Sequence, residues 1–406
     1  MKLLLAFLFL PYLLHSQSMR IEGIVTDVES NVSLPFAHVG LANSTIGVIT
    51  NSKGEFSLIL PTEKQSKQLQ VSYLGYTSRL IQIQQIPLNE QLIVKLTAVH
   101  TNLPELIIQA KKRSIIEEAI DAIPRNHDQS NMRLRGFWRS QMKDTKDFIQ
   151  LSETAFDVFR SDGKDVLQIL KGRASRDTTA FEQFKAFNAG ISPKSLFNSS
   201  FLIDLSILSK KIRKKHTYEI KDVSTYNNRP VFVVDFDKKK SNRDTGYKGR
   251  ILLDTETLAF VKISFGFSPW NTEVIEIFDS WISKKITKLG NSTWDKFDSE
   301  FNYHYADGKW YLSHSNFNVD WTLRDNDNTF SALIHYYGDF VVTEISKKNI
   351  ILPEKDERAR KGILIGQLDG STEDFWKNFN YLIPDQDYDQ VFKEMDARNK
   401  KIRKKK

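Results

Sequence analysis

Residues 20–98 alternate apolar and polar side chains in short runs, which is the pattern of β-strands with one buried face. The runs end at Gly, Pro, Asn or Asp, residues that favour turns. Gly54 stands where a Ser-Lys-Gly turn needs a positive φ, and Gly75 where a strand ends. The pattern predicts seven strands packed as a small antiparallel sandwich within residues 20–98. The predicted strands are 21–27, 37–41, 47–51, 55–60, 67–75, 78–84 and 90–96.

The pattern changes to helical spacing at residues 114–123, where isoleucine and alanine recur every third or fourth position. Ser114 is the predicted N-cap, and Glu117, three residues later, completes a capping box. Pro124 is expected to end this helix.

From residue 132 onward, longer alternating runs predict a second and larger sheet. Asp307-Gly308, flanked by aromatic alternation, predicts a tight hairpin. Residues 272–289 fit helix and strand equally well. Helices are predicted in a phenylalanine-rich insertion at about 177–212 and in two segments near the C-terminus, 371–384 and 387–401. The predicted β segments are 132–142, 148–160, 165–174, 216–226, 229–239, 247–257, 258–267, 294–323 and 328–345.

Many long antiparallel strands with one apolar face must curl or be covered. We therefore expect a mainly β fold, with an N-terminal seven-stranded sandwich and a larger, curved antiparallel sheet shaped like a half-barrel. The insertion at 177–212 is a natural lid over the concave side, and a groove beneath it would suit an acyl chain or a hydrophobic peptide. The alternative, which we favour, is that Phe184, Phe187 and their neighbours complete the core.

The N-terminal turn motifs, in their order and spacing, resemble the carboxypeptidase-regulatory-like domain. This domain is a transthyretin-like, Ig-like β-sandwich found ahead of TonB-dependent receptors and in other exported proteins of Gram-negative bacteria. Asn51 stands where the family more often has Asp, and Leu103–Ala110 resembles its closing strand. The resemblance implies an accessory sandwich and no peptidase activity. The motifs are Gly23, Val25 and Asp27, then Leu34-Pro35-Phe36-Ala37-His38-Val39, then Gly47 to Leu58, then Val71-Ser72-Tyr73-Leu74-Gly75-Tyr76.

Two further resemblances concern the rest of the chain. Residues 217–265, with the turn at Asp254–Thr257, resemble the repeating hairpins of proteins that carry or sort lipoproteins. The segments Ile115–Arg160, Asp307–Leu312 and Phe375–Asn380 resemble uncharacterised exported proteins that carry the same N-terminal sandwich. Neither resemblance implies a known chemistry.

The N-terminus has the features of a signal peptide. Met1-Lys2 precedes Leu3–Leu14, an uncharged run shorter than the about 20 residues that a membrane-spanning helix needs. Small residues follow, so we expect cleavage before Gln17 or Met19. No later stretch predicts a spanning helix. The expected location is the periplasm or the periplasmic face of the outer membrane.

The formal charge of +8 does not indicate a nucleic-acid-binding face. Arg398–Lys406 contributes seven basic residues without an acid, and Lys2 contributes one more, so the remainder is formally neutral. The basic tail could make a peripheral membrane contact. Five basic residues at 210–215 form an internal cluster that could touch phosphates or lipid headgroups, but we interpret it as a solvated charge run.

Candidate chemistry is sparse. The chain has no cysteine, which excludes disulfides, thiolate metal sites and thiol nucleophiles. His216 and Glu219 form an HxxE motif of the kind that zinc carboxypeptidases use, but they lie on a predicted strand and would point to opposite faces. His304 and His314 lie on adjacent predicted strands and could face one another, without an evident third ligand. We therefore predict no catalytic residue, no cofactor site and no metal site.

Six tryptophans of the second domain could stack on sugars or line an apolar groove, but we favour core positions in a large sheet. They are Trp138, Trp270, Trp281, Trp294, Trp310 and Trp321.

The sequence thus predicts an exported, non-enzymatic envelope protein. Its sandwich is joined to a larger binding or scaffold domain whose partner is an envelope protein or an apolar ligand. The alternative is a secreted hydrolase that uses carboxylates not identifiable in the sequence. The expected division is a signal peptide at 1–18, the sandwich at 20–98, a linker at 99–114, the β-rich domain at 115–350 and a helical, basic C-terminal segment at 351–406.

Overall fold

The computed structural model describes most of the chain. The described residues are 18–64, 67–87, 90–99, 114–161, 164–177, 206–241, 246–269, 293–324, 331–348, 350–359, 376 and 378–403.

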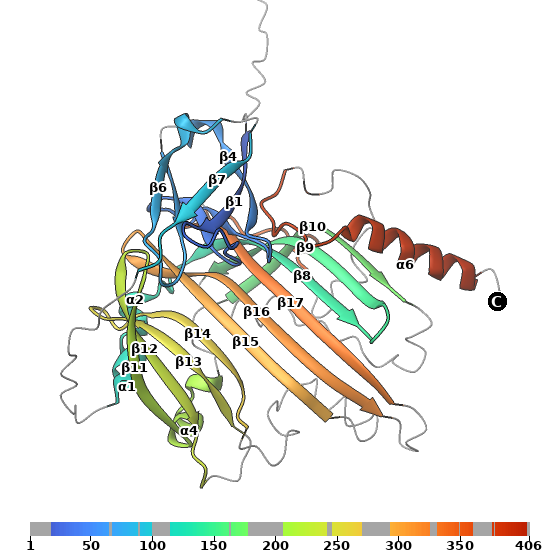
Figure 1. The fold of residues 1–406 in the computed structure, drawn as a ribbon. Coiled ribbons are helices and arrows are strands. Elements are labelled where there is room, and N and C mark those ends of the chain that lie inside the picture. The colour runs from blue at the N-terminus through green and yellow to red at the C-terminus, as the bar shows by residue number, and fades with distance from the viewer. Residues whose placement is uncertain are drawn as a thin grey trace, which may run out of the picture.

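The N-terminal part is a β-sandwich of two small sheets (Figure 1). One sheet has the strand order β4–β1–β7 and the other β3–β2–β5–β6. Valine, leucine and isoleucine side chains from both sheets fill the space between them. The strands are β1 (Ser18–Asp27), β2 (His38–Leu41), β3 (Gly47–Ile49), β4 (Glu55–Pro61), β5 (Gln68–Ser72), β6 (Arg79–Gln82) and β7 (Leu92–Leu96), with short 3-10 turns η1 (Thr62–Lys64) and η2 (Ile83–Gln85).

All seven predicted sandwich strands are present, but the expectation of a purely antiparallel sandwich is wrong. β1 pairs with β7 in parallel, with Gly23 opposite Leu92. β1 and β7 are the first and last strands, and no hairpin joins them, so nothing forces their directions to alternate. The turn before β4 is as predicted, because Gly54 has φ +77°.

The larger part is one ten-stranded antiparallel sheet in the order β10–β9–β8–β17–β16–β15–β14–β13–β12–β11. Asp307 and Gly308, both at positive φ, form the predicted hairpin between β15 and β16. The strands are β8 (Met132–Lys143), β9 (Phe148–Ser161), β10 (Lys164–Arg176), β11 (His216–Tyr226), β12 (Arg229–Lys238), β13 (Tyr247–Asp254), β14 (Phe260–Phe267), β15 (Thr293–Ala306), β16 (Lys309–Arg324) and β17 (Ser331–Ser346).

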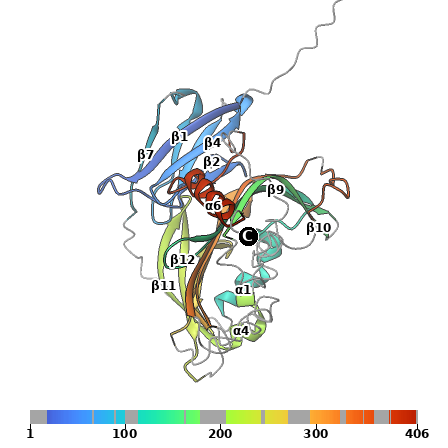
Figure 2. The ribbon, with the colours of Figure 1, turned by 90° about the vertical axis from the view of Figure 1, so that its right-hand side faces the viewer.

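The sheet is strongly curved, as Figure 2 shows, and different elements pack on its two faces. The concave face packs against α1 (Ile115–Asp121), α2 (Ile123–Asn126), η3 (Ser206–Leu208) and α4 (Lys210–Lys214). The convex face carries the sandwich and α6 (Tyr388–Arg403). The predicted mainly β fold with a curved antiparallel sheet is therefore confirmed.

Helix α1 differs from its prediction in two details. Ser114 is the N-cap residue, but its side chain makes no capping hydrogen bond, so this half of the predicted capping box is absent. Pro124 does not end the helical region. It lies in the first turn of α2, where its missing N–H is not needed.

The C-terminal segment also differs from its prediction. α6 matches the predicted second helix, but the described residues 378–386 are not helical. Trp376, Phe379 and Tyr381 instead pack between the sandwich and the sheet. The Asn380 side chain hydrogen-bonds both the N–H and the C=O of Ile59 on β4, at 2.6 and 3.0 Å. These tertiary contacts outweigh the local helix preference.

Within the described residues, no helix combines the length and the apolar character required to cross a membrane.

Candidate functional site

The two residues of the HxxE motif lie on opposite faces of the sheet. His216 is buried on β11, its Nδ1 lies 2.7 Å from the carbonyl of Ile212, and its Nε2 accepts a hydrogen bond from the Tyr247 N–H at 3.0 Å. Glu219 lies on the other face, where its carboxylate pairs with Lys221 at 2.6 Å. Both imidazole nitrogens are therefore engaged by backbone groups of the protein, one before β11 and one on β13. The described residues contain no group of three or more potential metal ligands.

His304 and His314, which could have faced one another, do not do so. Their strands do form a hairpin, but the register places Asn302 opposite His314 and Tyr311 opposite His304. A bulge at Asn302–Tyr303 shifts this register, and the sequence pattern does not reveal bulges.

Both histidines instead contact the sandwich. The His304 ring stacks on His38 with centroids 4.5 Å apart, and the His314 ring stacks on Phe36 at 5.2 Å. Phe36 has φ +60°, a conformation that costs a non-glycine residue free energy. The surrounding contacts must compensate for this cost, so the stack is a determinant of how the sandwich sits on the sheet.

Behind Phe36 lies a chain of polar groups on the convex face. Nε2 of His314 lies 3.0 Å from Oδ1 of Asp339, which also accepts the Tyr337 hydroxyl at 2.9 Å. The Asn302 amide lies 3.4 Å from Nδ1 of His314 and donates to Glu300 at 2.7 Å. At the far end of this row of polar groups, Lys262 forms an ion pair with Glu300 at 2.8 Å.

These contacts limit what His314 can do chemically. It is 1% exposed, Phe36 covers its ring, and each of its nitrogens faces a polar group of the protein. The nearby Ser313 hydroxyl donates to the backbone carbonyl of Asn302 at 3.0 Å and not to the imidazole. An Asp–His pair is present, but in the part of the chain that the structure describes no serine or threonine hydroxyl bonds the imidazole.

A cavity of about 310 Å³ lies next to these polar groups, between the sandwich and the sheet. Burial of Glu300 would raise its pKa, but the Lys262 ammonium together with the hydrogen bond from Asn302 holds the pKa below its usual value. Burial, with a smaller contribution from Glu300, raises the pKa of Tyr73. The cavity is lined by Pro35, Phe36, His38, Ile49, Ser72, Tyr73, Leu74, Tyr226, Leu252, Val261, Lys262, Glu300, Asn302 and Ser313.

A buried ionic cluster anchors the C-terminal segment. Glu153 is 1% exposed and pairs with Arg139 at 2.7 Å and Arg173 at 2.6 Å. Burial alone would raise the pKa of Glu153, but the two guanidinium groups hold it below its usual value. The Trp376 indole N–H donates to Glu153 at 3.2 Å, and Arg139 donates to the Leu382 carbonyl at 2.7 Å. The cluster therefore fixes the segment that packs under the sandwich.

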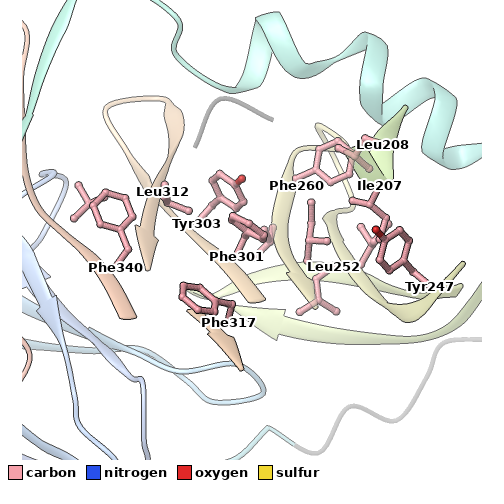
Figure 3. Close-up of a cluster of buried hydrophobic side chains, with 14 of the residues drawn as sticks. Ile207, Leu208, Tyr247, Leu252, Phe260, Phe301, Tyr303, Leu312, Phe317 and Phe340 are labelled. Carbon is pink, nitrogen blue, oxygen red and sulfur yellow. The ribbon is translucent and has the colours of Figure 1, made fainter. Parts of the chain in front are cut away.

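The concave face is a continuous apolar surface. Figure 3 shows Phe260 of β14 beside Tyr303 and Phe301 of β15. Ile207 and Leu208 of η3 pack beside Phe260 and Tyr247. Ile207 and Leu208 belong to the end of the predicted insertion and complete the core there. Phe184 and Phe187, which define the predicted lid, lie outside the described residues.

One end of this face carries contacting aromatic rings, which we call the aromatic belt: Tyr247, Phe265, Phe267, Trp294, Phe297 and Trp321. Centroids lie 5.3 Å apart for Tyr247–Phe265, 5.8 Å for Phe265–Phe297, 5.5 Å for Phe267–Phe297 and 5.5 Å for Trp294–Trp321. Phe265, Phe267 and Trp294 are only half-buried.

The predicted core position is confirmed for three of the tryptophans, whereas Trp294 is half-buried. Trp138, Trp310 and Trp321 are each 2% exposed, and Trp294 packs in the aromatic belt. Trp270 and Trp281 lie outside the described residues. The sequence reasoning overlooked Trp376, and no local signal distinguishes it, because its importance comes from a partner far away in the chain.

The sequence reasoning also missed the importance of Phe36, His38, Glu153 and Asp339. Phe36 and His38 were visible only as part of the family motif. Glu153 and Asp339 sit in strands that read as ordinary alternation, and only the pairing of β8 with β9 and of β16 with β17 brings them to their partners.

Comparisons with known proteins identify the sandwich. Residues 21–108 match the family model of the CarboxypepD_reg-like domain. No curated protein matches the chain.

Among solved structures, the chain is similar to a LolA superfamily protein from Nitrosomonas europaea, with 10% identity over 59% of this chain and 96% of that one and a TM-score of 0.21. It is also similar to a DUF1329 family protein from Desulfovibrio piger, with 8% identity over 59% of this chain and 93% of that one and a TM-score of 0.24. These values are too low to support a functional argument. The N-terminal part is therefore similar to the CarboxypepD_reg-like domain, and the ten-stranded sheet must be interpreted from its own geometry.

Proposed function

We propose that this chain is an exported, non-catalytic binding protein of the cell envelope, whose ten-stranded sheet receives a hydrophobic ligand on its concave side. The sandwich and the C-terminal segment pack on the convex face. On the concave face α1, α2, η3 and α4 cover the sheet, but Phe265, Phe267 and Trp294 stay half-buried there and offer a ligand apolar surface. The half-buried rings of the aromatic belt carry the proposal. Covering their remaining apolar area with a ligand would be favourable by about 25 cal/mol for each Å² removed from water.

A neutral apolar dye tests this proposal. N-phenyl-1-naphthylamine fluoresces strongly when it leaves water, so binding to the concave face should raise its emission. Phe267→Asp places a charge in the belt and should abolish the increase. Ser264→Asp adds the same charge to the same strand on the convex face, where Ser264 contacts the Arg250 carbonyl, and should leave binding unchanged. Equal dye binding by both variants, with circular dichroism showing that both are folded, would refute the proposal.

The same proposal includes export, which the charge-free run Leu3–Leu14 supports. N-terminal sequencing of protein from a cell-envelope fraction should find a mature chain that begins near Gln17 or Met19. An intact Met1 on cytoplasmic protein would contradict it.

The competing class is a hydrolase. The observation in its favour among the described residues is the buried Asp339–His314 pair near the cavity of about 310 Å³. Turnover on peptide or glycan panels that persists in the presence of a chelator and disappears in His314→Gln would favour the hydrolase over the binding protein.

A further inference from the structure

A group of lysines lies directly beside the aromatic belt. Lys210, Lys211, Lys214 and Lys215 come from α4 and its C-cap, and Lys239 and Lys240 follow β12. We call these six residues the basic rim. The Lys239 N–H donates to the Lys215 carbonyl at 2.9 Å, and its ammonium donates to the Lys214 carbonyl at 2.9 Å. These hydrogen bonds bring the two segments together. Figures 1 and 2 show α4 at the end of the sheet remote from the sandwich.

The stretch that contains α4 carries charge of one sign only. The sequence from Leu205 to Tyr218 contains five basic residues and no acid. Lys210, Lys211 and Lys214 are exposed. The nearest carboxylate in sequence to Lys239, Asp237, accepts the Ser268 hydroxyl at 2.7 Å. Farther along the same strand, Asp235 pairs with Arg250 at 2.7 Å. A cluster of one sign attracts anions.

The rim is fixed to the apolar face by His216. Its ring bridges α4 and β13, with Nδ1 near the Ile212 carbonyl and Nε2 accepting from the Tyr247 N–H. The same ring stacks on Tyr247, with centroids 6.4 Å apart, and Tyr247 begins the aromatic belt. Ile212, on the inner side of α4, packs against the concave core. Charge and apolar surface are thus adjacent and held in a defined arrangement.

We infer that the basic rim binds the anionic headgroup of a lipid whose acyl chain lies on the aromatic belt. Neither half alone carries this assignment, because a solvated lysine run and a buried aromatic cluster are each common. The combination is the chemistry of an amphiphile, with several cations at the mouth of an apolar surface. The inference rests on the proposed hydrophobic-ligand function and adds the class of ligand: a lipid with a phosphate or carboxylate head.

The test uses full-length mature protein and two lipids that share acyl chains and differ in headgroup charge. Protein is incubated with mixed micelles containing equal amounts of palmitoyl-oleoyl phosphatidylglycerol and phosphatidylcholine, and retained lipid is counted by native mass spectrometry. Phosphatidylglycerol should be retained in excess over phosphatidylcholine, and the excess should fall as salt is added. The rim variant Lys210→Glu/Lys211→Glu/Lys214→Glu should lower phosphatidylglycerol retention roughly tenfold, because each cation near an anionic lipid contributes to binding.

A matched control carries the same change of charge elsewhere. Lys53→Glu/Lys146→Glu/Lys355→Glu alters three exposed lysines that lie away from the rim, and it should retain phosphatidylglycerol like the wild type. Equal loss in both triple variants, or equal retention of the two lipids by the wild type, would overturn the inference. Titration with inorganic phosphate distinguishes a lipid site from a phosphate site. Tight phosphate binding that survives Phe267→Asp would also overturn it.

Binding of the neutral dye shows whether a negative result concerns only the headgroup assignment or the proposed hydrophobic-ligand function as a whole. If N-phenyl-1-naphthylamine binds while the lipids show no charge preference, the concave-face function stands and the headgroup assignment is wrong. If neither dye nor lipid binds, the proposed function itself fails. In the rim variant the dye should bind normally, which also shows that the variant is folded.

Discussion

Phe36 of the sandwich lies flat on His314 of the ten-stranded sheet, with ring centroids 5.2 Å apart and planes 10° from parallel. Phe36 takes a left-handed backbone conformation in doing so. The contact joins the two parts of the molecule and covers the Asp339–His314 pair. Phe36, a strained aromatic residue, is therefore one of the contacts that set how the sandwich sits on the sheet.

Replacing Phe36 should loosen the sandwich without unfolding either part. Phe36→Ala removes the ring but keeps the backbone strain, and should cost about 2 kcal/mol in urea unfolding. Phe36→Asn also removes the ring, but asparagine tolerates the left-handed conformation better. It should therefore be the less destabilised of the two variants. If the order were reversed, strain at φ +60° would not contribute.

The stacked histidines predict a stability that depends on pH. Burial lowers the pKa of His304 to about 4, and burial together with His304 lowers that of His38 well below its usual value. An unfolded histidine takes up a proton near pH 6.5. The folded state does not, so the contribution of this pair to stability is complete above about pH 6.5 and is lost as the pH falls towards 4.

Urea unfolding between pH 7 and 4 measures this loss, and His304→Phe is the matched variant because it keeps a ring against His38 and cannot titrate. Its slope of stability against pH should be smaller than that of the wild type in the window from about 6.5 to 4. Carboxylates with lowered pKa values, such as Glu300, contribute in both proteins and cancel in the comparison. Identical slopes would show that the protonation of the stacked histidines does not contribute to the pH dependence of stability.

The sequence predicted the strands well and the contacts between parts poorly. Alternation located β11, β12 and the β15–β16 hairpin, because each strand has one apolar face and a turn that local chemistry marks. The parallel pairing of β1 with β7 and the bulge at Asn302 could not be read from alternation, since both depend on which strands become neighbours. For the same reason the sequence singled out His304 and His314 but not their partners: like Glu153, they acquire their roles only from residues in distant segments.

The ionic cluster around Glu153 predicts a large cost on substitution. Glu153→Gln leaves Arg139 and Arg173 buried with an uncharged partner and should destabilise the protein by about 3–5 kcal/mol. Hydrogen exchange should also rise in residues 378–386, because Trp376 and the Leu382 carbonyl are bound by this cluster. Glu344→Gln, which breaks a partly exposed pair with Arg133, is the control and should cost less than about 1 kcal/mol. Similar costs for both would mean that the cluster does not stabilise the fold.

The contacts between the sandwich and the sheet make a specific prediction about cleavage between them. A protease site inserted within residues 100–113 separates the two parts covalently, yet they should still elute together in gel filtration. The Thr45 hydroxyl bonds the Ile345 carbonyl at 2.8 Å, the Gly75 N–H donates to the Thr225 carbonyl at 2.8 Å, and Asn380 holds β4 from the C-terminal side. The same cleavage in Phe36→Ala at pH 5 should release a fragment of about 80 residues, the size of the sandwich domain, because the ring stack is gone and the His38–His304 pair is weakened. Release of the wild-type fragment at pH 7 would contradict stable non-covalent contact between the sandwich and the sheet, since only the covalent link would then hold the sandwich in place.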